Sequence, residues 1–262
     1  MRILRAAIRL TVLLLSTFFF YSLIMIVLLL SVFGVNYERW RGYLLRNWGK
    51  SCCLILGCEV QVKGKAPEPP FFLVSNHLSY FDVFVLFSQL RGIFVAKSDV
   101  KSWPLVGMLT RTCGILFIDR ERKMDIPRVN QLISQNVNKN QGVIVFPESQ
   151  TSPGVEILPF RSSLLEYPAS VSLPVTYAAI TYSSPEGEID ACKEICWWEN
   201  LSFLTHFMRL LMKKEFTASI TFGKKKVAST NRKELARELL KSLKSDFIPV
   251  IDAKTFKDLV ED

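Results

Sequence analysis

The feature that most constrains this chain is a long run of uncharged, mostly apolar residues near its start. Residues 10–37 contain no Asp, Glu, Lys or Arg. At about 1.5 Å per residue, these 28 residues would form a helix of roughly 42 Å, whereas the hydrocarbon core of a bilayer is roughly 30 Å thick. Such a helix must tilt, or bend at the membrane surface, to keep its apolar residues in lipid. The run therefore predicts a membrane anchor, either spanning or monotopic.

A cleaved signal peptide is the alternative interpretation of this run. The apolar part of a signal peptide is usually shorter, and it ends in small residues before the cleavage site. This run ends instead in Gly34, Val35, Asn36 and Tyr37, which favours an anchor that is retained. Lys and Arg residues flank both ends of the run, so the positive-inside rule does not decide its orientation.

The charge distribution indicates the kind of surface that this chain binds. Its 262 residues carry 33 Lys and Arg against 24 Asp and Glu, a net charge of +9. Residues 1–50 alone contribute seven of the positive residues and one of the negative ones. Positive charge beside an apolar helix suits anionic lipid headgroups, and we expect no binding to nucleic acid. Residues 39–57 interleave Trp40, Tyr43 and Trp48 with basic residues, which is typical of an interfacial helix or of a helix packed in the core.

Beyond residue 58, short apolar runs alternate with longer amphipathic ones. The short runs predict strands at residues 59–62, 71–74, 92–96, 114–118, 142–146, 173–182 and 216–222. The longer runs predict helices at residues 81–90, 98–111, 126–137, 161–169, 201–212 and 232–243. This alternation predicts an α/β fold with a mostly parallel or mixed sheet covered by helices. We therefore expect a membrane anchor and interfacial helix at residues 1–58 and one α/β domain at residues 59–262.

The cysteines and histidines argue against a structural metal site. Cys52 and Cys53 are adjacent, Cys192 and Cys196 are separated by three residues, and the chain has only two histidines, so no zinc-site spacing is present. We expect no metal and six free thiols, as in proteins of a reducing compartment. This favours a domain on the cytoplasmic face of the membrane.

The clearest catalytic chemistry follows the second predicted strand. His77 and Asp82 are five residues apart, which in a regular helix would separate them by about 140° around the axis. We therefore expect His77 in a loop and Asp82 in the first turn of the next helix, where Ser79 and Asp82 form a capping box. Asp82 can then accept one imidazole N–H and leave the other nitrogen free as a base, while N–H groups at the helix start can stabilise an oxyanion. The alternative is that Asp82 only caps the helix and His77 is an ordinary loop residue.

Four ordered blocks resemble the motifs of the glycerolipid acyltransferases, a family that includes lysophosphatidate acyltransferase. The blocks are Asn-His-Leu-Ser-Tyr-Phe-Asp at residues 76–82, Gly-Ile-Leu-Phe-Ile-Asp-Arg at 114–120, Phe-Pro-Glu-Ser-Gln-Thr-Ser at 146–152 and Leu-Pro-Val at 173–175. The resemblance extends over about residues 59–225, and four blocks in order are more specific than any one of them. It implies an O-acyltransferase of a bacterial inner membrane, with acyl-CoA or acyl carrier protein as donor, a lysophospholipid as acceptor, membrane lipids as partners and no cofactor.

The same resemblance implies which residues carry the reaction. His77 would be the general base, and Asp82 would orient it. The residues implied in substrate binding are Asn76, Lys97, Arg120, Glu148, Thr151 and Arg161. Glu148 would either accept a hydrogen bond from the acceptor hydroxyl or order its own loop. His206, on a predicted amphipathic helix, is expected to be structural or close to the substrate, and the structural role is favoured.

The third block departs from the pattern that the family commonly shows. That pattern is Glu-Gly-Thr-Arg, whereas this chain has Glu148, Ser149, Gln150 and Thr151, so both the glycine and the arginine are absent. In lacking the arginine it resembles the branch that includes lyso-ornithine-lipid acyltransferases, which has Pro-Glu-Gly-Thr-Thr-Ser, whereas Ser149 and Gln150 are peculiar to this chain. The missing arginine is a bidentate phosphate ligand that a threonine does not replace. A phosphate on the acceptor would have to be met by Lys97, Arg120 or Arg161.

Three functions follow from these observations. The first is a 1-acylglycerol-3-phosphate acyltransferase that forms phosphatidic acid by direct transfer, since the chain has no Gly-x-Ser-x-Gly nucleophile elbow. The second keeps this chemistry but acylates lyso-ornithine lipid or another lysolipid. The third is a catalytically silent lipid-binding protein, against which the presence of both His77 and Asp82 argues.

Overall fold

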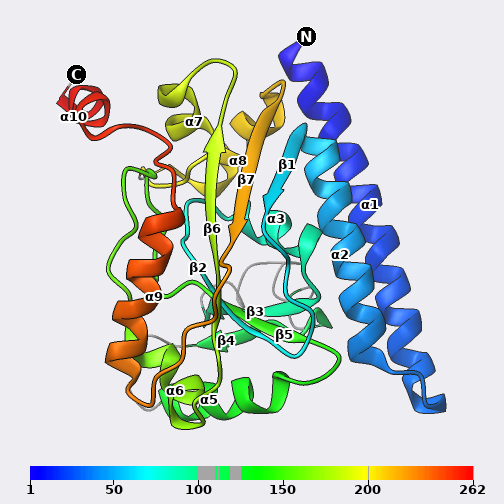
Figure 1. Ribbon diagram of the computed structural model, residues 1–262. Helices are drawn as coiled ribbons and strands as arrows, with labels where there is room; N and C mark the ends of the chain where they lie inside the picture. The colour runs from blue at the N-terminus through cyan, green and yellow to red at the C-terminus, as the bar shows by residue number, and fades with distance from the viewer. Residues whose placement is uncertain (99–109, 111, 119–124, 200, 262) are drawn as a thin grey trace.

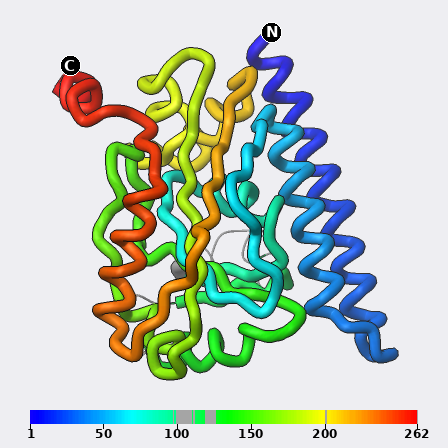
Figure 2. Tube along the Cα trace, in the orientation of Figure 1, coloured from blue at the N-terminus to red at the C-terminus, as the bar shows by residue number. Residues whose placement is uncertain are grey.

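The computed structural model describes residues 1–98, 110, 112–118, 125–199 and 201–261, apart from the side chains of Lys97 and Asp125 (Figure 1). The chain begins with the long helix α1 (Arg2–Leu30), which continues into the short 3-10 helix η1 (Ser31–Phe33). After a tight corner it returns as α2 (Tyr37–Leu56), whose first turn is capped by Asn36: its Oδ1 accepts the Arg39 N–H at 2.9 Å. Figure 2 shows α1 and α2 side by side along one edge of the molecule, with the corner at the end away from both termini.

The apolar N-terminal helix is confirmed. Among the described residues, the stretch from Arg2 to Phe33 is the one helix long and apolar enough to cross a membrane, and most of its apolar surface is exposed. Its inner face packs on α2, where Trp48 Nε1 donates to Thr17 Oγ1 at 3.1 Å and the Ser16 and Ser51 hydroxyls lie 2.8 Å apart. The N-terminal part of α1 also packs against α8 (Phe203–Met212).

The helix expected at residues 39–57 has two different faces. One face packs against α3 (Asp82–Gln89) and buries Leu45, Cys52 and Leu56 in the core. The other leaves Trp40 and Tyr43 exposed. The core-packing interpretation therefore describes most of α2, and an interfacial role for the exposed aromatic residues near its start stays a prediction.

The centre of the molecule is a seven-stranded mixed sheet, as the sequence predicted. Its strands are β1 (Cys58–Lys63), β2 (Phe72–Ser75), β3 (Gly92–Lys97), β4 (Leu116–Ile118), β5 (Gly142–Val145), β6 (Thr176–Ser183) and β7 (Phe216–Phe222). They lie in the order β1-β7-β6-β2-β5-β3-β4, and all neighbours are parallel except β6 and β7. Each predicted strand is present, with ends shifted by up to three residues.

Helices cover both faces of this sheet (Figure 1). The remaining helices are α5 (Asp125–Asn136), η3 (Ser162–Leu165), α6 (Glu166–Ser170), α7 (Glu188–Glu194), α9 (Arg232–Asp246) and α10 (Ala253–Glu261). The helix predicted at residues 98–111 lies almost wholly outside the described residues. The short helix α7 and the C-terminal helix α10 were not predicted as helices.

Period-two alternation along the central strands creates two separate cores. Leu73 of β2 and Ile144 of β5 belong to the core shared with α2, α3 and α8, whereas their neighbours Phe72, Val74 and Val145 belong to the core shared with α5 and α9. Successive side chains of a strand point to opposite faces, so uninterrupted apolar strands require helices on both sides. The strands β2 and β5 are parallel neighbours, with Val74 paired to Val145, and both end at the same edge of the sheet. The loops that follow them are thereby brought together.

Candidate active site

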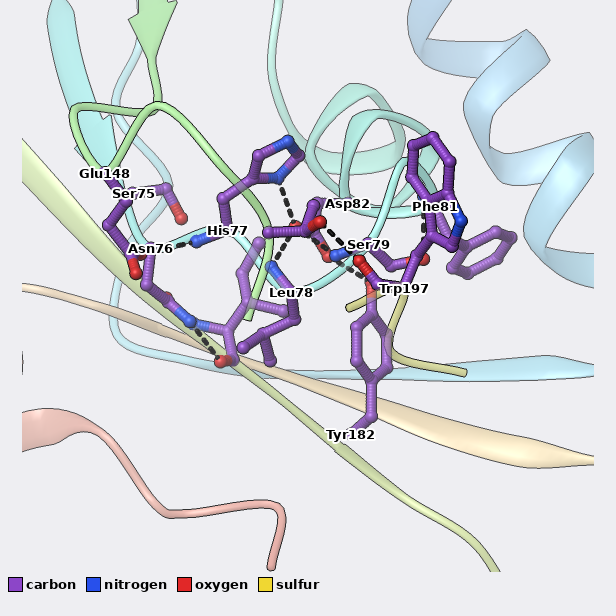
Figure 3. A network of polar contacts seen from close by, with 12 residues as sticks. Ser75, Asn76, His77, Leu78, Ser79, Phe81, Asp82, Glu148, Tyr182 and Trp197 are labelled. Carbon is purple, nitrogen blue, oxygen red and sulfur yellow. Dashed lines mark hydrogen bonds and ion pairs between the residues drawn. The ribbon is translucent and has the colours of Figure 1, made fainter. Parts of the chain in front are cut away.

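The loop after β2 holds the predicted catalytic pair in contact. Nδ1 of His77 lies 2.7 Å from Oδ2 of Asp82, which is fully buried, whereas 20% of the His77 side chain is exposed. Because a carboxylate only accepts hydrogen bonds, His77 donates its Nδ1–H to Asp82. Figure 3 shows the other ring nitrogen, Nε2, pointing away from Asp82. This is the arrangement expected of a general base with a fixed tautomer.

Asp82 is held by three further hydrogen bonds. Its Oδ2 also accepts the backbone N–H groups of Leu78 at 2.8 Å and Ser79 at 3.1 Å, and its Oδ1 accepts the hydroxyl of Tyr182 at 2.5 Å (Figure 3). Complete burial of Tyr182 and the neighbouring carboxylate raise the pKa of its phenol well above the usual value, so this hydroxyl remains a donor. The carboxylate is thus fixed in position by hydrogen bonds to both oxygens.

Only half of the expected capping box forms. Asp82, which begins α3, accepts the Ser79 N–H at 3.1 Å, but the Ser79 hydroxyl accepts the Phe81 N–H at 3.3 Å instead of the Asp82 N–H. The N–H of Leu78 is likewise bound to Asp82. These donors orient the carboxylate, so they are not available to a developing oxyanion as the residues now lie.

The imidazole ring of His77 is also fixed by aromatic packing. It stacks on Phe146, with ring centroids 4.0 Å apart and planes inclined by 11°, and Phe146 in turn stacks on Phe94 at 5.6 Å. Phe146 lies directly after β5, next to the loop that follows β2. The stacking limits rotation of the ring and keeps Nε2 on the side away from Asp82.

Glu148 joins the loop after β2 to the loop after β5. Its Oε1 accepts the backbone N–H of His77 at 2.8 Å, and its Oε2 accepts that of Leu158 at 2.9 Å. Burial raises the pKa of this carboxyl to about 8, partly opposed by the two N–H donors and reinforced by the nearby negative charge of Asp82. Of the two roles expected for Glu148, the structure displays the ordering of the loop around the base.

The side chains of Asn76 and Thr151 also form hydrogen bonds with backbone groups of the protein. The buried amide of Asn76 exchanges two hydrogen bonds with the backbone of Ile180 in β6, at 2.9 and 2.7 Å. Thr151 Oγ1 donates to the carbonyl of Trp197, and the Trp197 N–H donates to the carbonyl of Leu78 at 2.8 Å. These contacts tie the loops after β2 and β5 to β6 and to the segment that follows α7.

The basic residues expected near the acceptor are only partly placed. Lys97 is the last residue of β3, but its side chain is outside the described part of the molecule, and so is all of Arg120. Arg161 is exposed, and its backbone N–H donates to the carbonyl of Pro147 at 2.9 Å, in the same loop as Glu148.

His206 is structural in this fold, as expected. Its Nε2–H donates to the carbonyl of Cys196 at 3.0 Å, so its Nδ1 accepts the hydroxyl of Tyr80, also at 3.0 Å. Burial lowers the pKa of His206, which favours this neutral form. The six cysteines are free thiols, and no three His, Cys, Asp or Glu side chains gather as a metal site within the described residues.

Two residues that position His77 had no assigned role in the sequence. Tyr182 was included in a predicted strand and Phe146 in a motif block, but neither had a predicted contact. Tyr182 lies 100 residues from Asp82 along the chain, and no linear spacing reports such a contact. The hydrophobic side chains of both residues predict that they are buried, but not which residues they contact.

Comparison with known sequences assigns the same region to one family. The family model described as Acyltransferase matches residues 58–181. A lyso-ornithine lipid O-acyltransferase of Rhizobium meliloti is 32% identical over 213 residues, which is 75% of this chain and 72% of that protein. A 1-acyl-sn-glycerol-3-phosphate acyltransferase of Neisseria gonorrhoeae is 28% identical over 176 residues, covering 66% of this chain and 68% of that protein.

A solved structure shares the overall fold. The crystal structure of the 1-acyl-sn-glycerophosphate acyltransferase PlsC from Thermotoga maritima matches 94% of this chain and 97% of that one, with a TM-score of 0.59 and 19% sequence identity. The match includes the N-terminal helices as well as the sheet, since it covers nearly the whole chain. Together with the Rhizobium relative, the family match establishes that this chain belongs to the acyltransferase family that includes the lysophospholipid acyltransferases.

Proposed function

We propose that this protein transfers a fatty acyl group from acyl-CoA or acyl carrier protein to the free hydroxyl of 1-acylglycerol-3-phosphate, giving phosphatidic acid. The observation that carries the proposal is the 2.7 Å hydrogen bond between His77 and buried Asp82, with Nε2 of His77 pointing away from Asp82. A histidine held in this way is suited to take a proton from a hydroxyl group.

In the proposed reaction, Nε2 of His77 removes the proton of the acceptor hydroxyl as that oxygen attacks the thioester carbonyl. The tetrahedral intermediate then collapses, the carbon–sulfur bond breaks, and the thiolate takes the proton back from Nε2–H. The products are an ester and a free thiol, and the enzyme returns to its starting state. Asp82 stabilises the imidazolium that exists between the two proton transfers. General-base catalysis of this kind contributes about 10² to 10⁴-fold, and positioning of the substrates supplies a further part.

The choice of 1-acylglycerol-3-phosphate rests on two supports. The Neisseria relative carries that activity in its name. In addition, the backbone of Lys97 at the end of β3 and that of Arg161 beside Pro147 lie at the edge of the sheet where His77 lies, and the proposal assigns the acceptor phosphate to these two cationic residues. Parallel α/β sheets bind their ligands at this carboxyl edge.

Lyso-ornithine lipid is the second candidate acceptor, and one observation favours it. Thr151 occupies the position where the family commonly has arginine, and its hydroxyl is engaged with the carbonyl of Trp197. A residue engaged in this way supplies no bidentate phosphate contact. The Rhizobium relative, at 32% identity, is named for this acceptor.

The proposed location is a membrane, with the α/β domain on its cytoplasmic face. The exposed apolar surface of α1 supports membrane attachment. Free thiols at all six cysteines are consistent with a reducing compartment. In this position the acceptor lipid and the water-soluble acyl donor both reach the domain.

The test is an acyl-transfer assay on the full-length protein in detergent, with products identified by mass spectrometry. Lysophosphatidate and lyso-ornithine lipid are each offered with acyl-CoA and with acyl carrier protein, beside the His77→Ala protein. We expect phosphatidic acid from the unmutated protein and a loss of at least about 100-fold in kcat for His77→Ala, with an unchanged thermal unfolding midpoint.

Each other outcome contradicts a defined part of the proposal. Product from lyso-ornithine lipid alone would replace the acceptor with the second candidate. Full activity in the His77→Ala protein would remove the assigned base. Binding of both lysolipids without product would identify the catalytically silent lipid-binding protein instead.

A further inference from the structure

A charged cavity lies at the edge of the sheet opposite to His77. It has a volume of about 390 Å³ and is lined by Arg39, Tyr43, Arg91, Lys139 and Asn140, which we call the basic pocket. Arg91 directly precedes β3, and Asn140 lies two residues before β5, whereas His77 follows β2. These three strands are parallel, so the basic pocket and the catalytic loop lie at opposite ends of them. The pocket is therefore separate from the proposed active site.

The lining of this pocket is strongly cationic. Arg39, Arg91 and Lys139 contribute three positive charges, and no carboxylate lines the cavity within the described part of the chain. Exposed Glu68 forms an ion pair with Arg91 and offsets one of these charges. The pocket therefore retains a net positive charge and is suited to an anion.

Arg91 is held in place before any ligand arrives. Its guanidinium carbon lies 4.7 Å from the centre of the Tyr43 ring, and Glu68 binds its terminal nitrogen. Helix α2 approaches it so closely that a Cβ atom at Gly42 would lie 3.3 Å from Cβ of Arg91. Such a constrained guanidinium loses less conformational entropy when it binds an anion than a free one does.

A third guanidinium, that of Arg41, lies in the same junction between α2 and the start of β5. Arg41 is buried and donates to Oε1 of Gln141, the residue that follows Asn140 in the chain. Its guanidinium carbon lies 4.9 Å from the centre of the Tyr37 ring. In low-dielectric surroundings its charge adds to the positive potential of this part of the molecule.

The surroundings of the basic pocket are typical of a membrane surface. It includes residues from the first turns of α2, directly after the corner where Val32 is 83% exposed and Phe33 is 85% exposed. Trp40, next to Arg39, is 53% exposed. Exposed apolar residues followed by Trp, Tyr and Arg match the change from acyl chains to headgroups at a bilayer surface. A phosphate at the level of Trp40 would lie beside the pocket.

We infer that the basic pocket binds the phosphate of an anionic phospholipid of the membrane in which the corner between α1 and α2 lies. The ligand chemistry is a phosphate group recognised by Arg39, Arg91 and Lys139. The bound lipid is not a substrate, because its site lies at the opposite end of β2 from His77. It fixes the first turns of α2 at the headgroup level, with the α1–α2 corner among the acyl chains, independently of the acceptor that the enzyme uses.

The experiment measures thermal unfolding of the full-length protein in neutral detergent micelles with increasing mole fractions of phosphatidylglycerol. A ligand that binds the folded state raises the unfolding midpoint in a saturable way. The test variant is Arg39→Gln/Lys139→Gln. The matched control is Lys50→Gln/Lys225→Gln, which removes the same charge from two exposed lysines outside the pocket. Phosphatidylcholine and inorganic phosphate are the comparison ligands.

We expect the unmutated protein and the control variant to saturate at similar phosphatidylglycerol contents, and the pocket variant to need about tenfold more. Equal weakening in the pocket and control variants would overturn the proposal, because net charge would then account for binding. An equal response to phosphatidylcholine would overturn the anionic lipid as ligand. An equal response to inorganic phosphate would identify a free anion as the ligand. If the double variant is unstable without lipid, the single variants Arg39→Gln and Lys139→Gln decide the question by the same comparison.

Discussion

The hydroxyl of Tyr182 donates a 2.5 Å hydrogen bond to Oδ1 of Asp82, the oxygen opposite to the one that binds His77. Tyr182 lies near the end of β6, which pairs with β2 and so stands beside the catalytic loop. The catalytic pair is thus extended by a third, fully buried residue that does not reach the proposed substrates. It is a positioning residue, since it acts on the base through Asp82.

Replacement of this hydroxyl is expected to affect turnover more than substrate binding. Tyr182→Phe leaves one oxygen of a buried carboxylate without its donor, at a cost of about 1 to 3 kcal/mol in stability. We expect kcat to fall about tenfold with little change in KM. Asp82 will attract the imidazolium more strongly, so the acid limb of the pH–rate profile will move to higher pH.

The control for this experiment is Tyr177→Phe. Tyr177 lies on the same strand, and its hydroxyl donates to Asp246 at 3.1 Å, outside the catalytic loop. We expect this variant to keep both kcat and the pH–rate profile. A Tyr182→Phe protein that loses stability but keeps its profile would show that Tyr182 has a structural role only.

The buried carboxyl of Glu148 predicts a pH dependence of stability. Its pKa is about 8 in the folded protein, against 4.5 for an ordinary glutamate, so the folded state binds this proton more tightly than the unfolded chain. Its contribution to stability is complete below about pH 4.5 and is lost as the pH rises toward 8. We expect unfolding free energies from urea titration to fall across this interval more steeply for the unmutated protein than for Glu148→Gln.

A neighbouring glutamate provides the comparison. Glu156 is exposed and pairs with Lys244 at 3.3 Å, so Glu156→Gln should leave the slope of stability against pH unchanged. Equal slopes for the unmutated and Glu148→Gln proteins would mean that Glu148 keeps an ordinary pKa in the fold.

The backbone at Ser149 explains why the family commonly has glycine after the motif glutamate. Ser149 has a φ of 68°, a left-handed conformation that costs an ordinary residue about 1 to 2 kcal/mol. We expect Ser149→Gly to be as stable as the unmutated protein or up to about 1 kcal/mol more stable. Ser149→Val should be less stable by about 1 to 3 kcal/mol, because a β-branched residue tolerates this conformation poorly.

Urea unfolding of these variants tests the prediction, with the same two substitutions at Gln150 as controls. Gln150 is exposed and has no positive φ. If valine costs as much at residue 150 as at residue 149, the cost does not come from the left-handed backbone.

Two arginines of α1 bind the end of α8, and their removal should loosen this contact. Arg5 donates to the carbonyl of Met212 at 2.9 Å, and Arg9 donates to those of Lys213 and Lys214, the latter at 2.9 Å. Cations at a helix C-terminus each contribute about 0.3 to 1 kcal/mol. We expect Arg5→Gln/Arg9→Gln to lower the unfolding free energy by about 1 kcal/mol and to speed hydrogen exchange in the last turn of α8. Arg2→Gln/Lys50→Gln, with the same change in charge, should do neither.

Local patterns in the sequence predicted the sheet and the catalytic pair because both depend on short-range chemistry. The apolar run at residues 142–146 contains strand β5, and Asp82 binds the backbone N–H of Ser79 only three residues away. The loop position of His77 follows from the same spacing. Residues that are close together in the chain therefore largely determine these features.

Features that depend on distant residues were not predictable in this way. The contact between Tyr182 and Asp82 depends on β6 lying next to β2, and the loop-ordering role of Glu148 depends on β5 lying on the other side. Asn76 was predicted to bind substrate, and in the structure its side-chain amide exchanges hydrogen bonds with the backbone of Ile180, over 100 residues away. The short helix α7 has too few residues for a clear period.

The bonds from Arg5 and Arg9 to the end of α8 mean that α1 is no flexible tether. Helix α8 carries His206, which binds Tyr80 two residues before Asp82. A continuous chain of contacts therefore runs from the apolar helix to the catalytic loop. On the proposed function, a domain held to its anchor in this way keeps His77 at one fixed height relative to the bilayer, and the acceptor lipid would have to rise to meet it.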